Sequence, residues 1–466
     1  MPPLTRRQTL AAAAALPALS LLPSGPAGAQ PAFAPPPGAR PLFGAETWRL
    51  PNGLTVVHVE QRRAPVVSQF LFIPAGGAED PPGKSGTAHF LEHMMFKGSP
   101  RVASGEFSRR VAREGGRDNA FTSRDVTAYH QTVAARHLPM IAMMEADRFA
   151  APLIPAAEVE SERSVILEER RQVVDSNPRS RFREAFDAAM FGPQHWKGRS
   201  LIGWEEEIRA ITREDIVAFH ETHYGTEGAV LVIAGAVSRA ELDTVLAETY
   251  AAVPRRAVPA RSRGPLPEAL HTERFVRHDP ALREASFHRV WVSPSLTWGE
   301  TRHAIPLAVA AQVLGGGQGS RLHRALVESG LAVSAGASVW TDTVGAGLFG
   351  VSVAPRPRVS LAEVERVAND TVAPLVQEGI SEAETARAIR HLTAGALLSL
   401  DSLGAAPRLI GSALAIGLPI ERVEFWPAMV RAVTPAEATA ALRATLGANP
   451  LSATGWHLPE GTEAPA

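Results

Sequence analysis

Two histidines and a glutamate fall within five consecutive positions of this sequence, as His89, Glu92 and His93 in the segment HFLEHMMFKG. On an α-helix, positions i, i+3 and i+4 share one face, so these polar side chains would point the same way. The spacing H-x-x-E-H is a zinc-binding pattern of hydrolases, in which both imidazoles bind the metal. The segment therefore predicts a helix that supplies two zinc ligands, with a merely solvent-exposed polar face as the alternative. The opposite face would be apolar and buried, through Ala88, Leu91, Met94 and Met95.

The residues around this segment predict where the helix begins and ends. Thr87 belongs to the residue types that cap helix N-termini, and Gly98 belongs to a type that commonly follows helix C-termini. We therefore expect a helix that is capped by Thr87 and runs through Phe96.

A hydrolytic zinc site takes three protein ligands and leaves a fourth position open for water, so one more ligand must come from elsewhere. The segment AAEVESERSVILEERRQVVDS, residues 156–176, predicts a charged helix. Most of its glutamates are expected to pair on the helix surface with Arg163, Arg170 and Arg171. Spacing alone does not choose a ligand among Glu158, Glu160, Glu162, Glu168 and Glu169.

Strand and helix patterns alternate through the chain, which predicts an α+β fold. Pro51 to Gly53 predict a hairpin turn, and residues 228–237 predict a buried strand. The second half repeats this theme with strand patterns at 287–294 and 347–355 and a helix pattern at 305–314. With 466 residues, the chain is expected to form two related domains, each a mixed β-sheet packed against helices.

Two proline-rich segments, residues 30–44 and 254–272, are expected to be linkers. They bound an N-terminal domain at 45–253 and a C-terminal domain at 273–460. The second linker is basic and is expected to be a solvent-exposed connector that carries Arg255, Arg256, Arg261 and Arg263.

The first 29 residues have the pattern of a signal peptide: a basic start, an apolar run to Leu22 and small residues at Ala27 to Ala29. Paired Arg6 and Arg7 resemble a twin-arginine signal, which predicts a periplasmic or secreted protein. An uncleaved N-terminal segment is the alternative. The chain contains no cysteine, so no disulfide is expected. No second long apolar stretch follows, and no membrane insertion is expected after signal removal.

The overall charge is balanced, with 47 Lys and Arg against 48 Asp and Glu. The net charge of the chain would therefore not attract nucleic acid or an anionic membrane. Partners must be selected by local sites.

Four segments together resemble the M16 peptidases, above all the M16B group that includes mitochondrial processing peptidase. They are GTAHFLEHMMFKGS, NAFTSRDVTAYH, ERSVILEERR and GRSLIGWEEEIRAITREDIVAFHETHYGTEGAVLVIAG. The likeness spans nearly all of residues 45–460 and is denser in the first half. It implies a half clam shell of two homologous domains, one Zn²⁺ per chain and peptide substrates.

The resemblance also implies roles for individual residues. Glu169 matches the third zinc ligand, with Glu168 as the alternative, and Glu162 matches a glutamate that supports the ligands. Zinc lowers the pKa of its bound water toward about 7, and Glu92 would take that water's proton as a general base. Residues 119–122 (Asn119, Ala120, Phe121 and Thr122) match an edge strand that pairs with the substrate backbone. The alternative is an ordinary strand with Asn119 as a turn residue.

One part of the family pattern is missing from the second half. Active members carry an arginine and a tyrosine that bind substrate, whereas the segment SRLHRALVESGLAVSAG has Val327 and Val333 at these positions. All three tyrosines of the chain precede residue 251. We therefore expect a heterodimer in which a homologous M16B partner chain supplies the pair, with unfolded or short peptides as substrates. A weakly active homodimer and a non-catalytic M16-like scaffold subunit are the alternatives.

Overall fold

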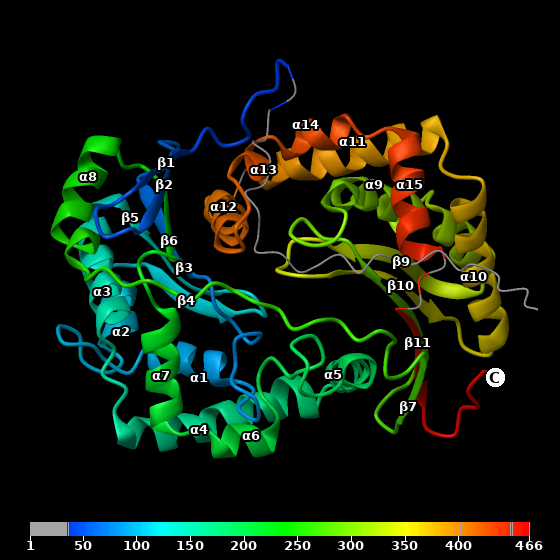
Figure 1. Ribbon diagram of the computed structural model, residues 1–466, viewed down its shortest axis with the longest axis horizontal. Coiled ribbons are helices and arrows are strands. Elements are labelled where there is room, and N and C mark those ends of the chain that lie inside the picture. Colours follow the sequence, from blue (N-terminus) through cyan, green and yellow to red (C-terminus); the bar gives the residue numbers. More distant parts are fainter. Residues whose placement is uncertain (1–34, 36, 401, 448, 450, 466) are drawn as a thin grey trace, which may run out of the picture. The chain divides into compact units, whose positions relative to one another are not determined.

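The computed structural model describes residue 35 and residues 37–400, 402–447, 449 and 451–465. The expected signal peptide, residues 1–29, and the beginning of the expected linker at 30–44 lie outside these residues. Within the described residues, strands and helices alternate along the chain and form two β-sheets packed against helices (Figure 1). The predicted α+β class is confirmed.

The first half of the chain forms a six-stranded mixed sheet. Its strands are β1 (Glu46–Arg49), β2 (Thr55–Glu60), β3 (Val66–Ile73), β4 (Arg117–Thr122), β5 (Thr127–Ala134) and β6 (Val230–Gly235). Their order is β1-β2-β6-β3-β5-β4, with β2 and β6 parallel and all other neighbours antiparallel. The predicted hairpin at Pro51 to Gly53 joins β1 to β2, and β4 lies at one edge of the sheet.

The second half forms a five-stranded sheet with the same topology. Its strands are β7 (Arg274–Asp279), β8 (Ser286–Ser293), β9 (Ala332–Trp340), β10 (Gly347–Pro355) and β11 (Ser452–Pro459). Their order is β7-β11-β8-β10-β9, with β7 and β11 parallel. Numbered along the chain from β2 and from β7, both sheets have the strand order 1-5-2-4-3. The two halves are therefore related, as the sequence predicts.

Helices cover one face of each sheet with side chains from its own half of the chain. On β3, Leu71 points into the core shared with these helices, whereas Phe70 and Phe72 point to the opposite face, because strand side chains alternate. The first half contains α1 (Thr87–Met94), α2 (Glu106–Arg113), α3 (Leu138–Ala150), α4 (Ala156–Arg170), α5 (Pro178–Phe191), α6 (Glu205–Ala210), α7 (Arg213–His223) and α8 (Arg239–Glu248). The second half contains α9 (Ala304–Gly315), α10 (Leu361–Gln377), α11 (Glu382–Ser399), α12 (Ala405–Ala415), α13 (Glu421–Glu424), α14 (Trp426–Arg431) and α15 (Pro435–Leu446).

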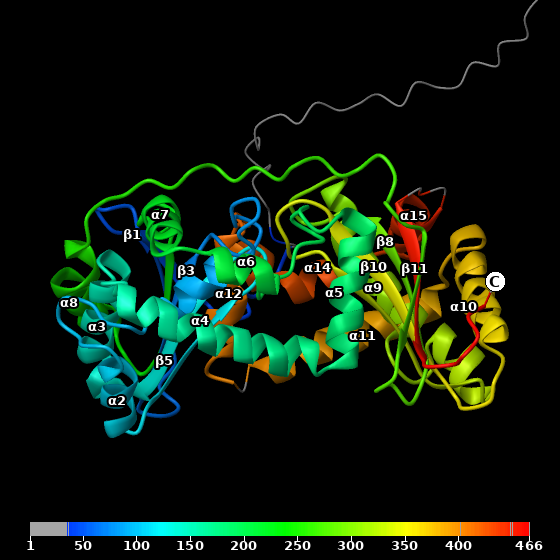
Figure 2. The ribbon, with the colours of Figure 1, turned by 90° about the horizontal axis from the view of Figure 1, so that it is seen from below.

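A helix from the opposite half packs on part of the other face of each sheet. Helix α12 packs on the first sheet, on the side away from α1 and α4 (Figure 1), where Ile410 joins Phe70 and Phe72 in one apolar cluster. Helix α5 packs on the second sheet, on the side away from α10 (Figure 2), where Phe182 and Phe186 contact the strands. Each half thus contributes a helix to an apolar cluster on the sheet of the other.

The segment between the sheets, residues 254–272, contains no helix or strand. The expectation that its arginines are all solvent-exposed is wrong. The side chain of Arg255 is 70% exposed, but that of Arg263 is only 8% exposed and forms ion pairs with Glu79 and Asp125. Arg261 donates a hydrogen bond to the carbonyl oxygen of Ala415 at 2.7 Å. Carboxylates and carbonyls far away in the sequence supply the partners that make this burial possible.

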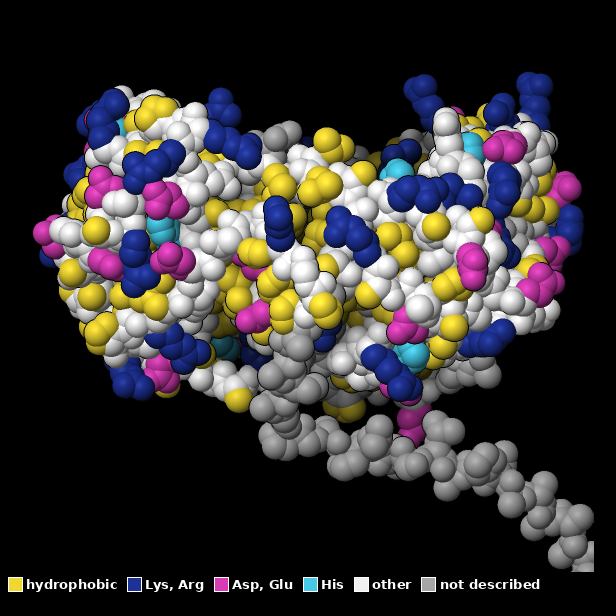
Figure 3. Space-filling view, turned by 90° about the horizontal axis from the view of Figure 1, so that it is seen from above, with side chains coloured by type: hydrophobic (Ala, Val, Ile, Leu, Met, Phe, Trp, Pro, Cys, Tyr) yellow, Lys and Arg dark blue, Asp and Glu magenta, His cyan; other side chains and the backbone are white. Residues whose placement is uncertain are grey.

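The surface shows no gathering of one charge sign on the face seen in Figure 3, where basic and acidic side chains are interspersed. This distribution agrees with the balanced composition of 47 Lys and Arg against 48 Asp and Glu. Among the described residues, no helix has both the length and the apolar character needed to cross a membrane.

The close contact between α12 and β3 predicts a position that does not tolerate a side chain. A Cβ atom on Gly411 would lie 2.0 Å from a ring carbon of Phe72, so Gly411→Ala should destabilise the fold by about 1–3 kcal/mol through overpacking. Urea denaturation followed by tryptophan fluorescence measures this change.

The matched control is Gly395→Ala in α11, where a Cβ atom would meet nothing within 4 Å. Both substitutions gain about 0.5–1 kcal/mol of helix propensity, so the difference between them isolates the clash. Equal unfolding midpoints for the two variants would contradict the packing of α12 on the first sheet.

Candidate metal centre

The helix that carries the H-x-x-E-H residues starts at a carboxylate rather than at a capping threonine. Asp80 Oδ2 accepts a hydrogen bond from the Gly86 amide at 2.7 Å, and Oδ1 accepts one from the Ala88 amide at 2.8 Å. The Thr87 hydroxyl instead donates to the Lys84 carbonyl oxygen, so the expected Thr87 cap is wrong. A distant carboxylate can satisfy the free amides of a first helical turn as well as a local cap can. The helix ends at Met94, two residues before the expected Phe96.

The apolar side of α1 is buried as predicted, since Ala88, Leu91 and Met94 are fully inaccessible to solvent and Met95 nearly so. The polar side carries His89 and His93, whose ring centroids are 4.7 Å apart. Packing therefore holds the helix in an orientation that leaves both imidazoles on the face away from the core.

Helix α4 brings Glu169 against the two histidines. Its Oε2 lies 3.3 Å from His93 Nε2 and 3.6 Å from His89 Nε2, and one ligand atom from each residue lies within 4.8 Å of the other two. Tetrahedral zinc with bonds near 2.0–2.1 Å separates its ligand atoms by about 3.4 Å. The three side chains therefore fit a zinc ion, and three ligands leave one coordination position for water or substrate.

The neighbouring glutamate, Glu168, points away from this cluster. Its carboxylate accepts hydrogen bonds from Arg171 and Gln172 at 2.7 Å each, and its side chain is 46% exposed. Of the glutamates that spacing left open, the structure places Glu169 with the histidines. The expected surface pairing of Arg170 is wrong, because this arginine is buried and binds Glu184.

Glu162 lies about two helical turns before Glu169, on nearly the same face of α4, and fixes the orientation of His93. Its Oε1 accepts a hydrogen bond from His93 Nδ1 at 2.8 Å, and its other oxygen pairs with Lys97. This contact leaves His93 Nε2 facing Glu169. A carboxylate behind a histidine fixes the tautomer and ring orientation in many metal sites.

The two imidazoles differ in their affinity for a proton. Burial, assisted by the charge of His93, lowers the pKa of His89 to about 4. Burial alone would also lower the pKa of His93, but hydrogen bonds to Glu162 and Glu169 outweigh it and raise that pKa to about 9. The hydrogen bond from His93 lowers the pKa of Glu169. A metal ion that binds here must therefore displace a proton from His93.

Glu92 lies on the same helix face as the two histidines, but its carboxylate contacts β4 instead of α4. Its Oε2 accepts a hydrogen bond from the Thr122 hydroxyl at 2.5 Å. Burial raises the pKa of Glu92 above its ordinary value. A carboxylate with a raised pKa, fixed beside a metal site, suits the transfer of a proton at neutral pH. The family resemblance assigned Thr122 to an edge strand but gave no sign that its hydroxyl bonds Glu92.

Residues Asn119 to Thr122 form the end of β4, the edge strand of the first sheet. The turn alternative for Asn119 is not what the structure has, because this residue pairs with His130 within the ladder to β5. Thr122 ends the strand where it meets Glu92. One side of β4 pairs with β5, and its other side has no strand partner in the described part of the chain.

The two valines of the second half occupy different elements. Val327 lies in the π-helical turn His323–Glu328, and Val333 lies on β9 with 55% of its surface exposed. Neither side chain carries a hydrogen-bond donor.

The fold and the site together define a protein of two related α+β halves, with a candidate zinc site formed by a helical H-x-x-E-H pattern and a distant glutamate. Residues 55–203 match the profile of the Insulinase (Peptidase family M16) family, and residues 210–392 match the profile described as the Peptidase M16 inactive domain. This chain belongs to the M16 peptidase family.

Individual relatives support this assignment. A protein of Mycobacterium tuberculosis described as an uncharacterized zinc protease is 31% identical over 362 residues, covering 76% of this chain and 79% of that protein. The mitochondrial-processing peptidase subunit beta of Saccharomyces cerevisiae is 27% identical over 389 residues, covering 79% of this chain and 81% of that protein. The crystal structure of a protease from Helicobacter pylori shares the fold, with a TM-score of 0.81, 22% identity and coverage of 90% of this chain and 100% of that chain.

The ligand geometry predicts different outcomes for two adjacent glutamates. Glu169→Gln should lower zinc affinity by at least about 10–100-fold, because the site loses a charged ligand. Losses of this size are typical even for residues that only support the ligands. Glu168→Gln should leave zinc affinity unchanged, since its carboxylate pairs with Arg171 away from the cluster. Competition with a chromogenic chelator measures both affinities. A loss of affinity in Glu168→Gln, with none in Glu169→Gln, would reverse the ligand assignment.

Proposed function

We propose that this protein is the zinc-bearing subunit of an M16B metalloendopeptidase that hydrolyses unfolded or short peptides. The observation that carries the proposal is the placement of Glu92. It stands on the same helix as His89 and His93, and Thr122 at the end of the free edge strand β4 holds its carboxylate at 2.5 Å. A base, three metal ligands and a strand edge for substrate thus meet at one place.

The protein side of the reaction follows from these contacts. When bound, Zn²⁺ supplies Lewis acidity to the attacking water and to the peptide carbonyl. The substrate backbone pairs with the unpaired side of β4, which orients the peptide with little dependence on its side chains. Glu92 accepts a proton from the water while the water oxygen forms a bond to the carbonyl carbon. Glu92 then returns the proton to the leaving nitrogen as the carbon–nitrogen bond breaks.

We further propose that a homologous partner chain completes the active site. Val327 and Val333 stand where active members of the family carry an arginine and a tyrosine, and neither valine can donate a hydrogen bond to a developing oxyanion. Loss of one such donor typically lowers kcat by about 10²–10³-fold. A relative named as subunit beta of a processing peptidase supports a two-chain arrangement.

The site of action is proposed to be the periplasm or the outside of the cell. The support is the signal-like sequence of residues 1–29 with its paired Arg6 and Arg7. A chain without cysteine folds without any dependence on disulfide formation in such a compartment.

The division of labour between two chains predicts how activity is distributed. We expect little hydrolysis of unstructured peptides by the zinc-loaded chain alone and full activity when an M16-like chain encoded beside its gene is added. Glu92→Gln in the mixture should abolish hydrolysis while zinc content stays at the wild-type value, because Glu92 is not among the three clustered ligands. Fluorogenic peptide assays and metal analysis measure both quantities.

Each alternative gives a different result in the same assay. Activity of the isolated chain that does not increase when the partner is added would show that the partner is dispensable, as in the weakly active homodimer. An inactive mixture in which this chain retains no zinc would instead identify it as a scaffold subunit.

The proposed export route predicts a strict requirement for the arginine pair. Replacing both residues by lysine, Arg6→Lys with Arg7→Lys, keeps the basic charge but should block twin-arginine export and retain the protein in the cytoplasm. Fractionation followed by immunoblotting gives the distribution. Export of the double variant at the wild-type level would exclude the twin-arginine route.

A further inference from the structure

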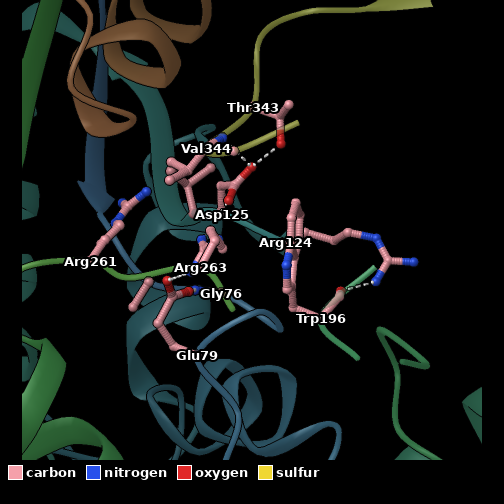
Figure 4. Close-up of polar contacts among 12 residues, drawn as sticks. Gly76, Glu79, Arg124, Asp125, Trp196, Arg261, Arg263, Thr343 and Val344 are labelled. Carbon is pink, nitrogen blue, oxygen red and sulfur yellow. Dashed lines mark hydrogen bonds and ion pairs between the residues drawn. The ribbon is translucent and has the colours of Figure 1, made fainter. Parts of the chain in front are cut away.

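Arg263, in the segment between the two sheets, is held between two loops of the first half. Its Nη1 donates to Glu79 Oε1 at 2.5 Å, and its Nη2 donates to Asp125 Oδ1 at 2.6 Å (Figure 4). The side chains of Arg263, Glu79 and Asp125 are each only 8% exposed. A buried guanidinium bridging two carboxylates fixes the distance between them in a way that an exposed pair does not.

The two loops that these carboxylates belong to are also joined through their backbones. The Gly77 amide donates to the Ser123 carbonyl oxygen at 3.0 Å, and the Ala78 amide donates to the Arg124 carbonyl oxygen at 2.9 Å. Glu79 Oε2 accepts a hydrogen bond from the Gly76 amide at 2.9 Å. A Cβ atom on Gly76 would lie 2.2 Å from the Ser123 carbonyl oxygen, so the two loops are too closely packed to admit a side chain there.

Each loop leads directly into one part of the candidate active site. The first loop continues from Glu79 into Asp80, whose carboxylate starts helix α1. The second loop follows Thr122, the last residue of β4, which bonds Glu92. Arg263 therefore bridges the loop that leads into α1 and the loop that follows the edge strand.

The same cluster reaches the second half of the chain. Asp125 Oδ2 accepts hydrogen bonds from the Thr343 hydroxyl at 2.7 Å and from the Val344 amide at 3.1 Å (Figure 4). Thr343 and Val344 lie in the loop between β9 and β10. One carboxylate thus connects the linker arginine to a hairpin of the second sheet.

We propose that Arg263 is a positioning residue of the peptidase site. It keeps Glu92 and β4 in their relative positions and connects both to the second half of the chain through Asp125. This inference rests on the proposed function. The zinc ligands depend on a different contact, that between α1 and α4, where Glu169 meets the histidines. Loss of the bridge should therefore lower kcat without lowering zinc affinity.

The test uses Arg263→Lys in the zinc-loaded chain together with its partner. Lysine keeps the charge but cannot bridge both carboxylates with a planar fork. The expected result is a roughly 10–100-fold lower kcat, as for a misplacement of about 1 Å at a catalytic group, with zinc affinity unchanged. The matched control is Arg255→Lys in the same segment, whose side chain is 70% exposed and pairs with Glu227. This control should match the wild type.

A second measurement does not depend on catalysis or on a successful partner. Hydrogen exchange followed by mass spectrometry should be faster in Arg263→Lys than in the wild type for peptides covering residues 117–126, and unchanged for peptides covering α4. Thr343→Val, which leaves the two ion pairs of Arg263 in place, should accelerate exchange in the same peptides to a smaller degree.

The outcomes separate this inference from the proposed function. Wild-type kcat and wild-type exchange at residues 117–126 in Arg263→Lys would overturn the positioning role and leave the peptidase proposal intact. Accelerated exchange across the whole chain, α4 included, would also overturn it, because Arg263 would then be a general stabiliser. An inactive wild-type mixture would count against the proposed function, while the exchange data would still decide the role of Arg263.

Discussion

His93 is bonded on both sides by carboxylates, and the candidate site depends on this arrangement. Glu162 fixes one ring nitrogen and Glu169 faces the other, and both glutamates come from a single helix packed across α1. A shift of α4 along α1 would break both contacts together. The candidate metal site is therefore defined by one helix–helix contact, and the sheet beneath α1 keeps that contact in place. Glu92 depends on a separate contact with β4, so the proposed metal ligands and the proposed base are held by different parts of the core.

The sequence allowed prediction of those features that depend on neighbours in the chain. Helical periodicity was sufficient to place His89 and His93 on one face and Leu91 and Met94 on the other, because a helix fixes these directions by itself. Spacing could not choose Glu169 over Glu168, since that choice depends on how two distant helices pack; the family resemblance made it.

The features that the sequence did not reveal are contacts over long separations. Asp80 reaches a helix start six and eight residues away around a proline-rich turn, and Arg263 pairs with residues 184 and 138 positions distant. No local pattern marks such partners. The arginines of the 254–272 segment resemble those of any solvated linker, and only the tertiary fold shows which of them are buried.

The exchange of helices between the halves has a consequence for how the chain is made. The apolar face of the first sheet that carries Phe70 and Phe72 stays uncovered until α12, at residues 405–415, has been synthesised. When the first half of the chain has been synthesised, its core is therefore still incomplete. The nascent chain carries an exposed apolar surface for most of its translation. This side of the first sheet can therefore gain its helical cover only after residues 405–415 have been synthesised.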